Sequence, residues 1–226
     1  MHSRREEPAG LACIDLDGTL TRNRSSWQFI FESLGIWETI GMKNLQQFLD
    51  GEINYAKFAE KDVAAWEGLE EHRYLDILKA IPLNAGIDEL VTFFRKYGFK
   101  VYLISAGLYR FAEHICNRFG FDGFFGNEVE IVNGKLTGKM KHINVAWDGK
   151  ASIVRNLRNQ FAIPPSRVIA LGDSSGDLKM FEESGIKVAV NSTDENVIKA
   201  ATISVALQDF QDLIPLLEEE LRKVMN

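Results

Sequence analysis

The sequence predicts an α/β fold with a mostly parallel sheet and an all-helical insert after the first strand. From about residue 85 onward, helical and strand patterns alternate along the chain, which is typical of a parallel sheet with helices on both faces. Residues 22 to about 84 contain several amphipathic helical patterns and no convincing strand. The expected architecture is a Rossmann-like, doubly wound core domain at 1–20 and 85–226, with a helical cap domain at 21–84.

The first strand is expected in the apolar stretch that leads into ACIDLDGTLT (12–21). Asp15 and Asp17 follow it and leave the same face of an extended chain, because they are two positions apart. The insert comes next, and both of its connections fall beside these aspartates, so we expect a lid over them. We expect its aromatic residues to form the core of that lid. Its apolar residues recur at helical spacing in four stripes: Trp27, Ile30, Phe31 and Leu34; Leu45, Phe48 and Leu49; Tyr55, Phe58, Ala59 and Trp66; and Tyr74, Ile77 and Leu78.

The remaining elements alternate to the end of the chain. A hairpin is expected at 128–138 (EVEIVNGKLTG), because Asn133-Gly134 suits a two-residue primed turn. The other strands are expected at 100–105, 167–173, 186–190 and 202–205. The expected helices carry inward residues Leu90, Phe93 and Phe94; Phe111, Ile115 and Phe119; Ile153, Val154, Leu157 and Phe161; and Phe210, Leu213, Ile214 and Leu217.

Composition excludes several classes of function. A net charge of -6 in 226 residues argues against nucleic-acid binding, which leaves a basic footprint. No apolar run approaches the roughly 20 residues of a membrane span, and MHSRREEPAG lacks the apolar stretch of a secretory signal. Cys13 and Cys116 form no disulfide framework or metal-ligand spacing. We expect a cytoplasmic monomer or homodimer that acts on a small molecule, with no membrane partner.

Polar side chains end three of the expected strands. Asp15 and Asp17 follow the first, Ser105 ends the second in LISAG, and Asp173 and Asp177 follow the third in LGDSSGD. Ligands of open parallel sheets bind beyond the carboxyl ends of the strands. If these strands are neighbours, four carboxylates converge on one spot.

Converging carboxylates need a cation, because two like charges about 4 Å apart repel by around 4 kcal/mol at an effective dielectric near 20. Mg²⁺ fits an all-oxygen ligand set and leaves room for a phosphate, whereas Zn²⁺ is disfavoured without thiolate or histidine. The hydroxyl and amides of Ser105, Ala106 and Gly107, which open a helix, suit anion oxygens. Lys150, at the start of another helix, is the candidate counter-charge.

Taken together, DLDGTLT, LISAG, Lys150 and GDSSGDLKMF resemble, in order, the four motifs of the haloacid dehalogenase superfamily of phosphohydrolases. The resemblance runs from residue 12 to about 190. The helical insert after the first motif and the NGKLTG hairpin point to the phosphoserine phosphatase-like branch. The resemblance implies a Mg²⁺-dependent phosphatase that hydrolyses a small phosphorylated metabolite.

The resemblance also implies roles for the motif residues. Asp15 would be the nucleophile that forms an aspartyl-phosphate, and Asp17 would protonate the leaving alcohol and then activate water. Mg²⁺ would be held by Asp15, Asp173 and the backbone carbonyl of Asp17, with Asp177 in the outer shell or bound through water. Ser105 and Lys150, with the Ala106–Gly107 backbone, would bind the phosphoryl oxygens.

The substrate-reading positions depart from the phosphoserine phosphatase pattern. The acidic residue expected just after the first motif falls on Arg24, and the arginine expected at 54–68 is absent there, where the chain has Lys57, Lys61 and Asp62. Gly176 stands where the fourth motif has asparagine. Phosphoserine is one candidate substrate and another small phosphate ester is the alternative; Asn23, Arg24 and Trp27 are the candidate specificity residues.

Three other interpretations stay open. Receiver domains of signalling systems also phosphorylate an aspartate beside Mg²⁺, but they are about half this length and lack a helical insert. A binding protein that has lost turnover is a second possibility, which the intact motifs disfavour. Within the enzyme class, phosphotransfer to an acceptor other than water is the third.

Overall fold

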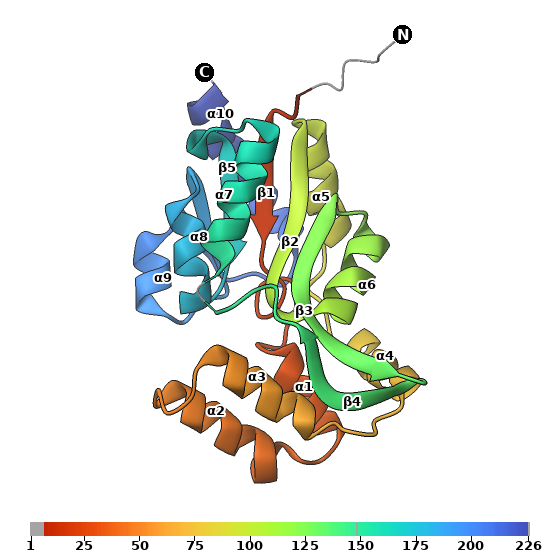
Figure 1. Cartoon of the computed structure of the whole chain (residues 1–226). Helices are drawn as coiled ribbons and strands as arrows, with labels where there is room; N and C mark the ends of the chain where they lie inside the picture. Colours follow the sequence, from red (N-terminus) through yellow and green to blue (C-terminus); the bar gives the residue numbers. More distant parts are fainter. Residues whose placement is uncertain (1–6, 148, 226) are drawn as a thin grey trace.

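The computed structural model describes residues 7–147 and 149–225, so most of the N-terminal stretch MHSRREEPAG lies outside the described residues. A seven-stranded sheet runs in the order β4-β3-β2-β1-β5-β6-β7 (Figure 1). Neighbouring strands pair in parallel except β3 and β4, which are antiparallel. The strands are β1 Gly10–Ile14, β2 Phe99–Leu108, β3 Gly123–Val132, β4 Lys135–His142, β5 Val168–Gly172, β6 Ile186–Val190 and β7 Ile203–Val205. The expected mostly parallel α/β fold is confirmed.

Helices cover both faces of this sheet. Along β1, Leu11 and Cys13 pack into the apolar cluster that includes α7, while Ala12 and Ile14 pack into the cluster that includes α5. This alternation follows from the two-residue period of a strand, and an all-apolar β1 is what a strand buried on both faces requires. The helices of this part are α5 Ile87–Lys96, α6 Tyr109–Phe119, α7 Lys150–Phe161, α8 Leu178–Glu182, α9 Glu195–Ala200 and α10 Ile214–Met225.

The insert is helical and lies beyond the carboxyl end of β1 (Figure 1). It contains α1 Ser26–Ser33, a π-helical segment Trp37–Gly41, α2 Met42–Leu49, α3 Tyr55–Ala64 and α4 Glu71–Lys79. Two of these helices begin at side-chain caps: Ser25 accepts from the amide of Gln28 and Asn54 from that of Lys57, which satisfies amides that an isolated helix end leaves free. The expected helical cap after the first strand is therefore confirmed.

The β3–β4 hairpin is bonded to the insert. Its turn residues Asn133 and Gly134 have φ of 51° and 75°, as the predicted primed turn requires. Leu136 accepts from the amide of Gly68 and donates to the carbonyl of Leu69, each at 2.9 Å. The domain boundaries at 20/21 and 84/85 remain a proposal, and the hairpin tip extends the insert in space.

β2 and α6 differ from the elements expected around Ser105. β2 continues past residue 105 to Leu108, and α6 begins only at Tyr109, so Ser105 to Gly107 do not open a helix. The register of β2 against β3 shifts between Ile104 and Leu108, so the segment from Ser105 to Gly107 is irregular although it lies within the strand.

Among the described residues, no helix has the length and apolar content needed to cross a bilayer.

Candidate active site

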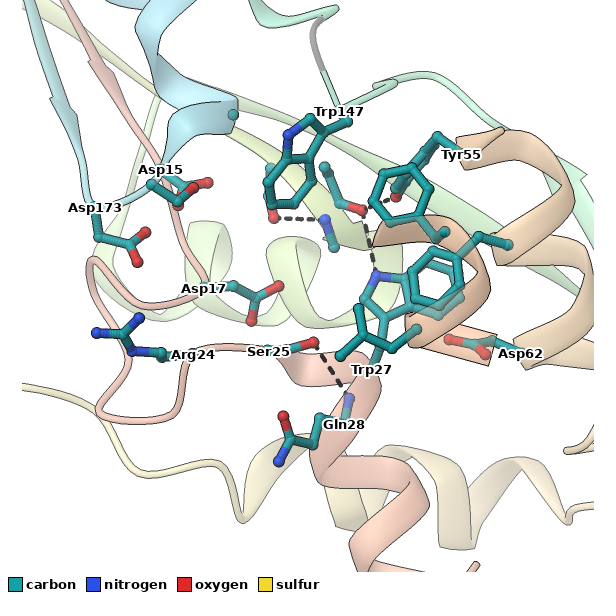
Figure 2. Close-up of a pocket in the computed structure, with 18 of the residues that line it drawn as sticks. Asp15, Asp17, Arg24, Ser25, Trp27, Gln28, Tyr55, Asp62, Trp147 and Asp173 are labelled. Carbon is teal, nitrogen blue, oxygen red and sulfur yellow. Dashed lines mark hydrogen bonds between the residues drawn. The ribbon is translucent and has the colours of Figure 1, made fainter. Parts of the chain in front are cut away.

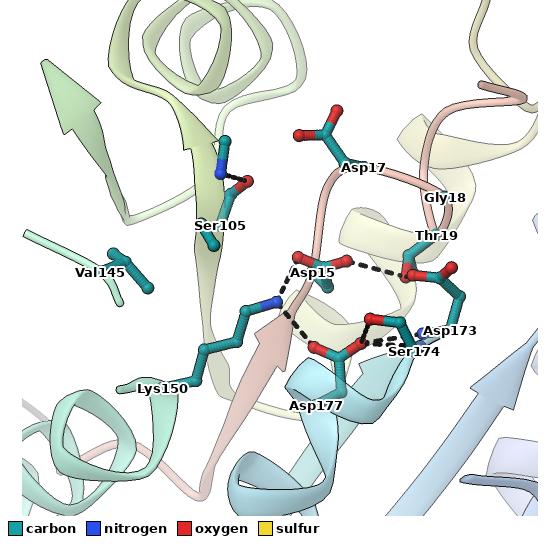
Figure 3. Close-up of polar contacts among 12 residues, drawn as sticks. Asp15, Asp17, Gly18, Thr19, Ser105, Val145, Lys150, Asp173, Ser174 and Asp177 are labelled. Carbon is teal, nitrogen blue, oxygen red and sulfur yellow. Dashed lines mark hydrogen bonds and ion pairs between the residues drawn. The ribbon is translucent and has the colours of Figure 1, made fainter. Parts of the chain in front are cut away.

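Three carboxylates meet at the carboxyl edge of the sheet. Because β1 and β5 are parallel neighbours with Ile14 opposite Leu171, the residues that come after the two strands emerge side by side. One oxygen from each of Asp15, Asp173 and Asp177 lies within 4.8 Å of the others (Figure 3). All three side chains are buried. The predicted convergence is present for three of the four carboxylates, and Asp17 is not part of the cluster.

Lys150 supplies the positive charge of this cluster. It is the first residue of α7 and is buried. Its Nζ lies 2.5 Å from Asp15 Oδ1 and 2.6 Å from Asp177 Oδ1. A buried ammonium is stable only when paired and hydrogen-bonded, and this one has two carboxylate partners.

Asp177 is fully engaged with the protein. Its Oδ2 accepts from the backbone amides of Asp173 at 3.0 Å and Ser174 at 3.1 Å, while its Oδ1 faces Lys150. Asp15 Oδ2 and Asp173 Oδ1 have weaker contacts, with the hydroxyl of Thr19 at 3.3 and 3.4 Å. The oxygens of Asp15 and Asp173 are therefore the ones available to an ion or a substrate.

The electrostatics of the cluster fit a bound cation. Burial, together with the neighbouring carboxylates, raises the pKa of Asp173 to about 7 and that of Asp15 well above its ordinary value, although Lys150 lowers both. Taking charge into a buried site disfavours the ionised form unless an opposite charge compensates. Lys150 pairs with only two of the three carboxylates, so an oxygen-ligated divalent metal would fit Asp15 and Asp173.

Gly18 permits the close approach of Asp173 to the first motif. Its φ is +80°, and a Cβ built on it would lie 2.6 Å from Asp173 Cγ. Any side chain would therefore both strain the backbone and displace the carboxylate. The glycine that the sequence places between the aspartates and Thr19 is needed for this geometry.

Asp17 points away from the three-carboxylate cluster. Its two oxygens accept from the amide of Ser26 at 2.9 Å and the hydroxyl of Ser26 at 2.8 Å. Burial raises the pKa of Asp17 to about 6, and the Ser26 hydrogen bonds counteract this. A carboxyl that titrates near neutral pH can both give and take a proton.

Ser105 is buried, and its Oγ accepts from the amide of Gly107 at 2.8 Å. That amide is consequently occupied within the loop, and the hydroxyl proton of Ser105 is the group left to donate. A Cβ at Gly107 would collide with the carboxylate of Asp17, so the loop also sets the position of Asp17. The structure brings Ser105, Ala106 and Gly107 to the same cavity as Asp15 and Lys150.

This cavity of about 330 Å³ lies between the edge of the sheet and the insert (Figure 2). One end is made by the carboxylates and Lys150. The remaining wall is mostly apolar and includes Trp27, Trp37, Leu45, Phe48, Leu49, Tyr55, Phe58 and Trp147. The expectation that the aromatic stripes form only lid core is wrong for Phe48 and Phe58, which are half-buried and line the cavity, whereas Phe31 and Trp66 are fully buried.

The three specificity candidates separate in the structure. Arg24 and Trp27 line the cavity. Arg24 donates to the hydroxyl of Thr193 at 2.8 Å and lowers the pKa of Asp173, so it lies at the carboxylate end. Asn23 instead uses its backbone carbonyl, which accepts from the amide of Gly18 at 3.0 Å.

Asn127 was not anticipated from the sequence. It is fully buried, and its Nδ2 lies 2.9 Å from Tyr55 Oη, from the Ala106 carbonyl and from the Val145 carbonyl. It thereby joins α3 of the insert to the Ser105–Gly107 segment. The only sequence signal was a lone amide in the apolar run before the hairpin, which is too weak to single out.

Comparisons with known proteins agree with this geometry. A model of haloacid dehalogenase-like hydrolases matches residues 12–182. A phosphoserine phosphatase of Archaeoglobus fulgidus is 32% identical over 184 residues, which is 81% of this chain and 53% of that protein. One of Idiomarina loihiensis is 32% identical over 142 residues, 63% of this chain and 64% of that protein. The chain thus spans between about half and two thirds of the length of these two relatives.

The fold is shared with solved structures. A phosphoserine phosphatase determined as a phospho-aspartyl intermediate analogue superposes with a TM-score of 0.81 at 23% identity, over 92% of this chain and 99% of that one. At this identity the likeness concerns the fold. It includes the sheet and the helical insert, because nearly the whole of both chains is covered.

Proposed function

Because the chain belongs to the haloacid dehalogenase-like hydrolase family, we propose that it is a phosphoric monoester hydrolase that works through an aspartyl-phosphate. The observation that carries this proposal is the asymmetry of Asp15. Its Oδ1 is held by Lys150, while its Oδ2 has only the hydroxyl of Thr19 at 3.3 Å. A carboxylate with one oxygen fixed and the other facing a cavity is a preorganised nucleophile.

The neighbouring groups are assigned roles from their contacts. Asp17, which Ser26 holds and whose pKa burial raises to about 6, protonates the leaving alcohol and then accepts a proton from the attacking water. The Ser105 hydroxyl and Lys150 donate to phosphoryl oxygens, where positioning and charge neutralisation dominate phosphoryl transfer. Asp177 positions Lys150 and the Asp173–Ser174 backbone.

The metal in this proposal is Mg²⁺, held by Asp15, Asp173 and the backbone carbonyl of Asp17. Hard oxygen ligands and incomplete protein coordination favour Mg²⁺ over softer metals. When bound, Mg²⁺ would offset the negative charge of the carboxylates and of the phosphoryl group. The proposed location is the cytoplasm, in keeping with two free, buried cysteines.

Phosphoserine is the first candidate substrate because the similar proteins carry that name. A different small phosphate ester is the alternative. Arg24 lines the cavity where the phosphoserine phosphatase pattern has an acidic residue, and Asp62 lines it from the segment where that pattern has an arginine. Transfer to an acceptor other than water would follow the same mechanism, because only the nucleophile that attacks the aspartyl-phosphate would differ.

Hydrolysis of p-nitrophenyl phosphate with Mg²⁺ tests the proposal. Nitrophenol and inorganic phosphate should be released in equal amounts. Nitrophenol in excess over phosphate when an alcohol is added would identify a transferase. Labelling of Asp15 without release of phosphate would identify a protein that is phosphorylated and does not turn over, and absence of both products in a metal-loaded preparation would contradict the proposal.

A further inference from the structure

One carboxylate lines the cavity away from the catalytic cluster. Asp62 lies on α3 and is 2% exposed, and Figure 2 shows it across the aromatic wall from Asp15 and Asp173. Its Oδ1 accepts from Asn44 Nδ2 at 2.9 Å. Within residues 7–147 and 149–225, no donor is bonded to its Oδ2. Burial raises the pKa of Asp62 to about 7, as expected for a carboxyl with one neutral partner.

The nearby cations are committed elsewhere. Lys57 pairs with Glu60 at 3.1 Å on the surface of α3. Lys61 lowers the pKa of Asp62, but it donates to Gln47 and is not among the lining residues of the cavity. The cationic side chains in the described cavity wall are Arg24 and Lys150, and both act on the catalytic cluster. The end of the cavity at Asp62 therefore offers a carboxyl group, and no cationic side chain in the described wall is available there to meet an anionic substituent.

The wall between the two ends is aromatic. Phe48 stacks on Phe58 with ring centroids 5.1 Å apart, and it meets Tyr55 and Trp147 edge-on at 6.0 and 6.1 Å. Aromatic faces attract cations electrostatically, and a carboxylate beside such rings strengthens the preference.

We propose that the cavity takes the phosphate ester of an alcohol that bears an ammonium group, with the phosphate at Asp15 and the ammonium at Asp62 among the rings. The inference rests on the proposed phosphatase function. It specifies in addition that the end of the substrate far from the phosphate is positively charged. Pairing with the ammonium gives Asp62 Oδ2 the donor that the protein does not provide. An ester whose only charged group at this end is anionic has no partner there and should be a poor substrate.

Three benzyl phosphates of nearly equal shape test the charge. They carry 4-aminomethyl, 4-methyl or 4-carboxy substituents, so the far group is cationic, neutral or anionic. A charge-assisted hydrogen bond contributes about 1.5–3 kcal/mol, so kcat/KM for the cationic ester should exceed that for the neutral ester about tenfold or more. The anionic ester should be the poorest of the three.

Asp62→Asn keeps the shape of the side chain and removes its charge. The ratio of kcat/KM for the cationic to the neutral ester should fall about tenfold, toward unity. Glu60→Gln is the matched control, because Glu60 is exposed on the same helix, and it should leave the ratio unchanged. A wild-type ratio near one overturns the inference, as does an unchanged ratio in Asp62→Asn; the wild-type ratio alone decides if that variant does not fold.

Failure of the proposed function gives a different result. If the wild-type protein hydrolyses neither the three esters nor p-nitrophenyl phosphate, the phosphatase assignment fails. Calorimetry on Asp15→Asn protein with Mg²⁺ then tests the cavity by itself. Binding in the order cationic, neutral, anionic supports the inference, and equal or absent binding overturns it.

Discussion

Lys150 Nζ lies 2.5 Å from Asp15 Oδ1, although 135 positions separate the two residues in the chain. Lys150 begins α7, and Asp15 follows β1. The contact ties one helix to the carboxyl end of the central strand. Because both groups are buried, the pair has consequences for stability as well as for catalysis.

Lys150→Met should lower the free energy of unfolding by about 3–5 kcal/mol, because removing one member of a buried ion pair leaves the other charge uncompensated. Urea unfolding at neutral pH measures the loss. Lys57→Met, which removes only an exposed pair with Glu60, should cost less than about 1 kcal/mol. A Lys150→Met protein as stable as the Lys57→Met protein would show that the Asp15 and Asp177 charges are compensated in another way.

Asp15→Asn should abolish both turnover and phosphoenzyme, since the amide cannot act as the nucleophile. Asp17→Asn should slow turnover by about 10²–10⁴-fold yet accumulate phosphoenzyme from p-nitrophenyl phosphate. The reason is that nitrophenolate leaves without a proton, whereas the attacking water still needs a base. Acid-quenched labelling with radioactive phosphate measures both. Asp76→Asn, an exposed carboxylate on α4, is the control, and stable labelling of the Asp15→Asn protein would refute the assignment.

Mg²⁺ should raise the thermal stability of the protein, and EDTA should reverse the effect. A ligand that binds only the folded state at 100 times its Kd adds about 2.7 kcal/mol. Asp173→Asn should lose most of this gain, because it removes one of the two carboxylates with oxygens free for a metal. Calorimetric melting with and without Mg²⁺ measures the effect. The same Mg²⁺-induced rise in Asp173→Asn would place the metal elsewhere.

Asp62 should make the protein less stable as the pH rises from about 4 to about 7. Its pKa is about 7 when folded against an ordinary value of 3.8, so the folded state binds the proton more tightly and loses stability as that proton leaves. Asn44 and Lys61, which face it, oppose the shift, and Tyr55 is the neighbouring titratable group. The wild-type free energy of unfolding, relative to Asp62→Asn, should fall by on the order of 3 kcal/mol across this range.

Urea unfolding at pH 4.5 and pH 8 measures this change. Glu60→Gln should follow the wild-type pH dependence, because Glu60 is exposed on the same helix. Parallel wild-type and Asp62→Asn curves would mean that Asp62 titrates at its ordinary pKa in the folded protein.

Asn127→Ala should destabilise the protein by at least about 2 kcal/mol, because it leaves buried carbonyls without donors. It should also raise KM, since Tyr55 would lose the contact that fixes it against the Ser105–Gly107 segment. Steady-state kinetics and urea unfolding measure the two effects. Asn159→Ala on the exposed face of α7 should change neither, and an unchanged KM in Asn127→Ala would confine Asn127 to a structural role.

The carboxylate end of the site was predictable, because its residues directly follow strands of the parallel sheet. Asp15 and Asp173 each come directly after a parallel strand, and the residues after neighbouring parallel strands emerge at one edge of the sheet. Lys150 was chosen as the counter-charge from its place at the start of a predicted helix, and its burial between Asp15 and Asp177 was visible only in the structure. Local spacing cannot tell a buried lysine from a solvated one at a helix start.

The cavity wall was less predictable, because local spacing also does not show what an apolar helix face packs against. The stripe of Leu45, Phe48 and Leu49 shows which face of α2 is apolar, but an apolar face can meet either a core or a hollow. Leu49 is 67% exposed and Phe48 lines the cavity, so the periodicity was right and the assignment of Phe48 to the lid core was not. Asn127 was missed because Tyr55, Ala106 and Val145 lie 72, 21 and 18 positions away, and single-sequence patterns carry no such pairing.

The two backbone hydrogen bonds of Leu136 with Gly68 and Leu69 bear on how substrate enters. A lid joined to its base only by two linkers can swing freely, whereas this one is also fastened to a hairpin that continues from the main sheet. If the lid moves to admit substrate, it must either break these hydrogen bonds or bend β3 and β4 along with the helices. The hinge of the entrance would then lie in β3 and β4 rather than in the connections at residues 21 and 84.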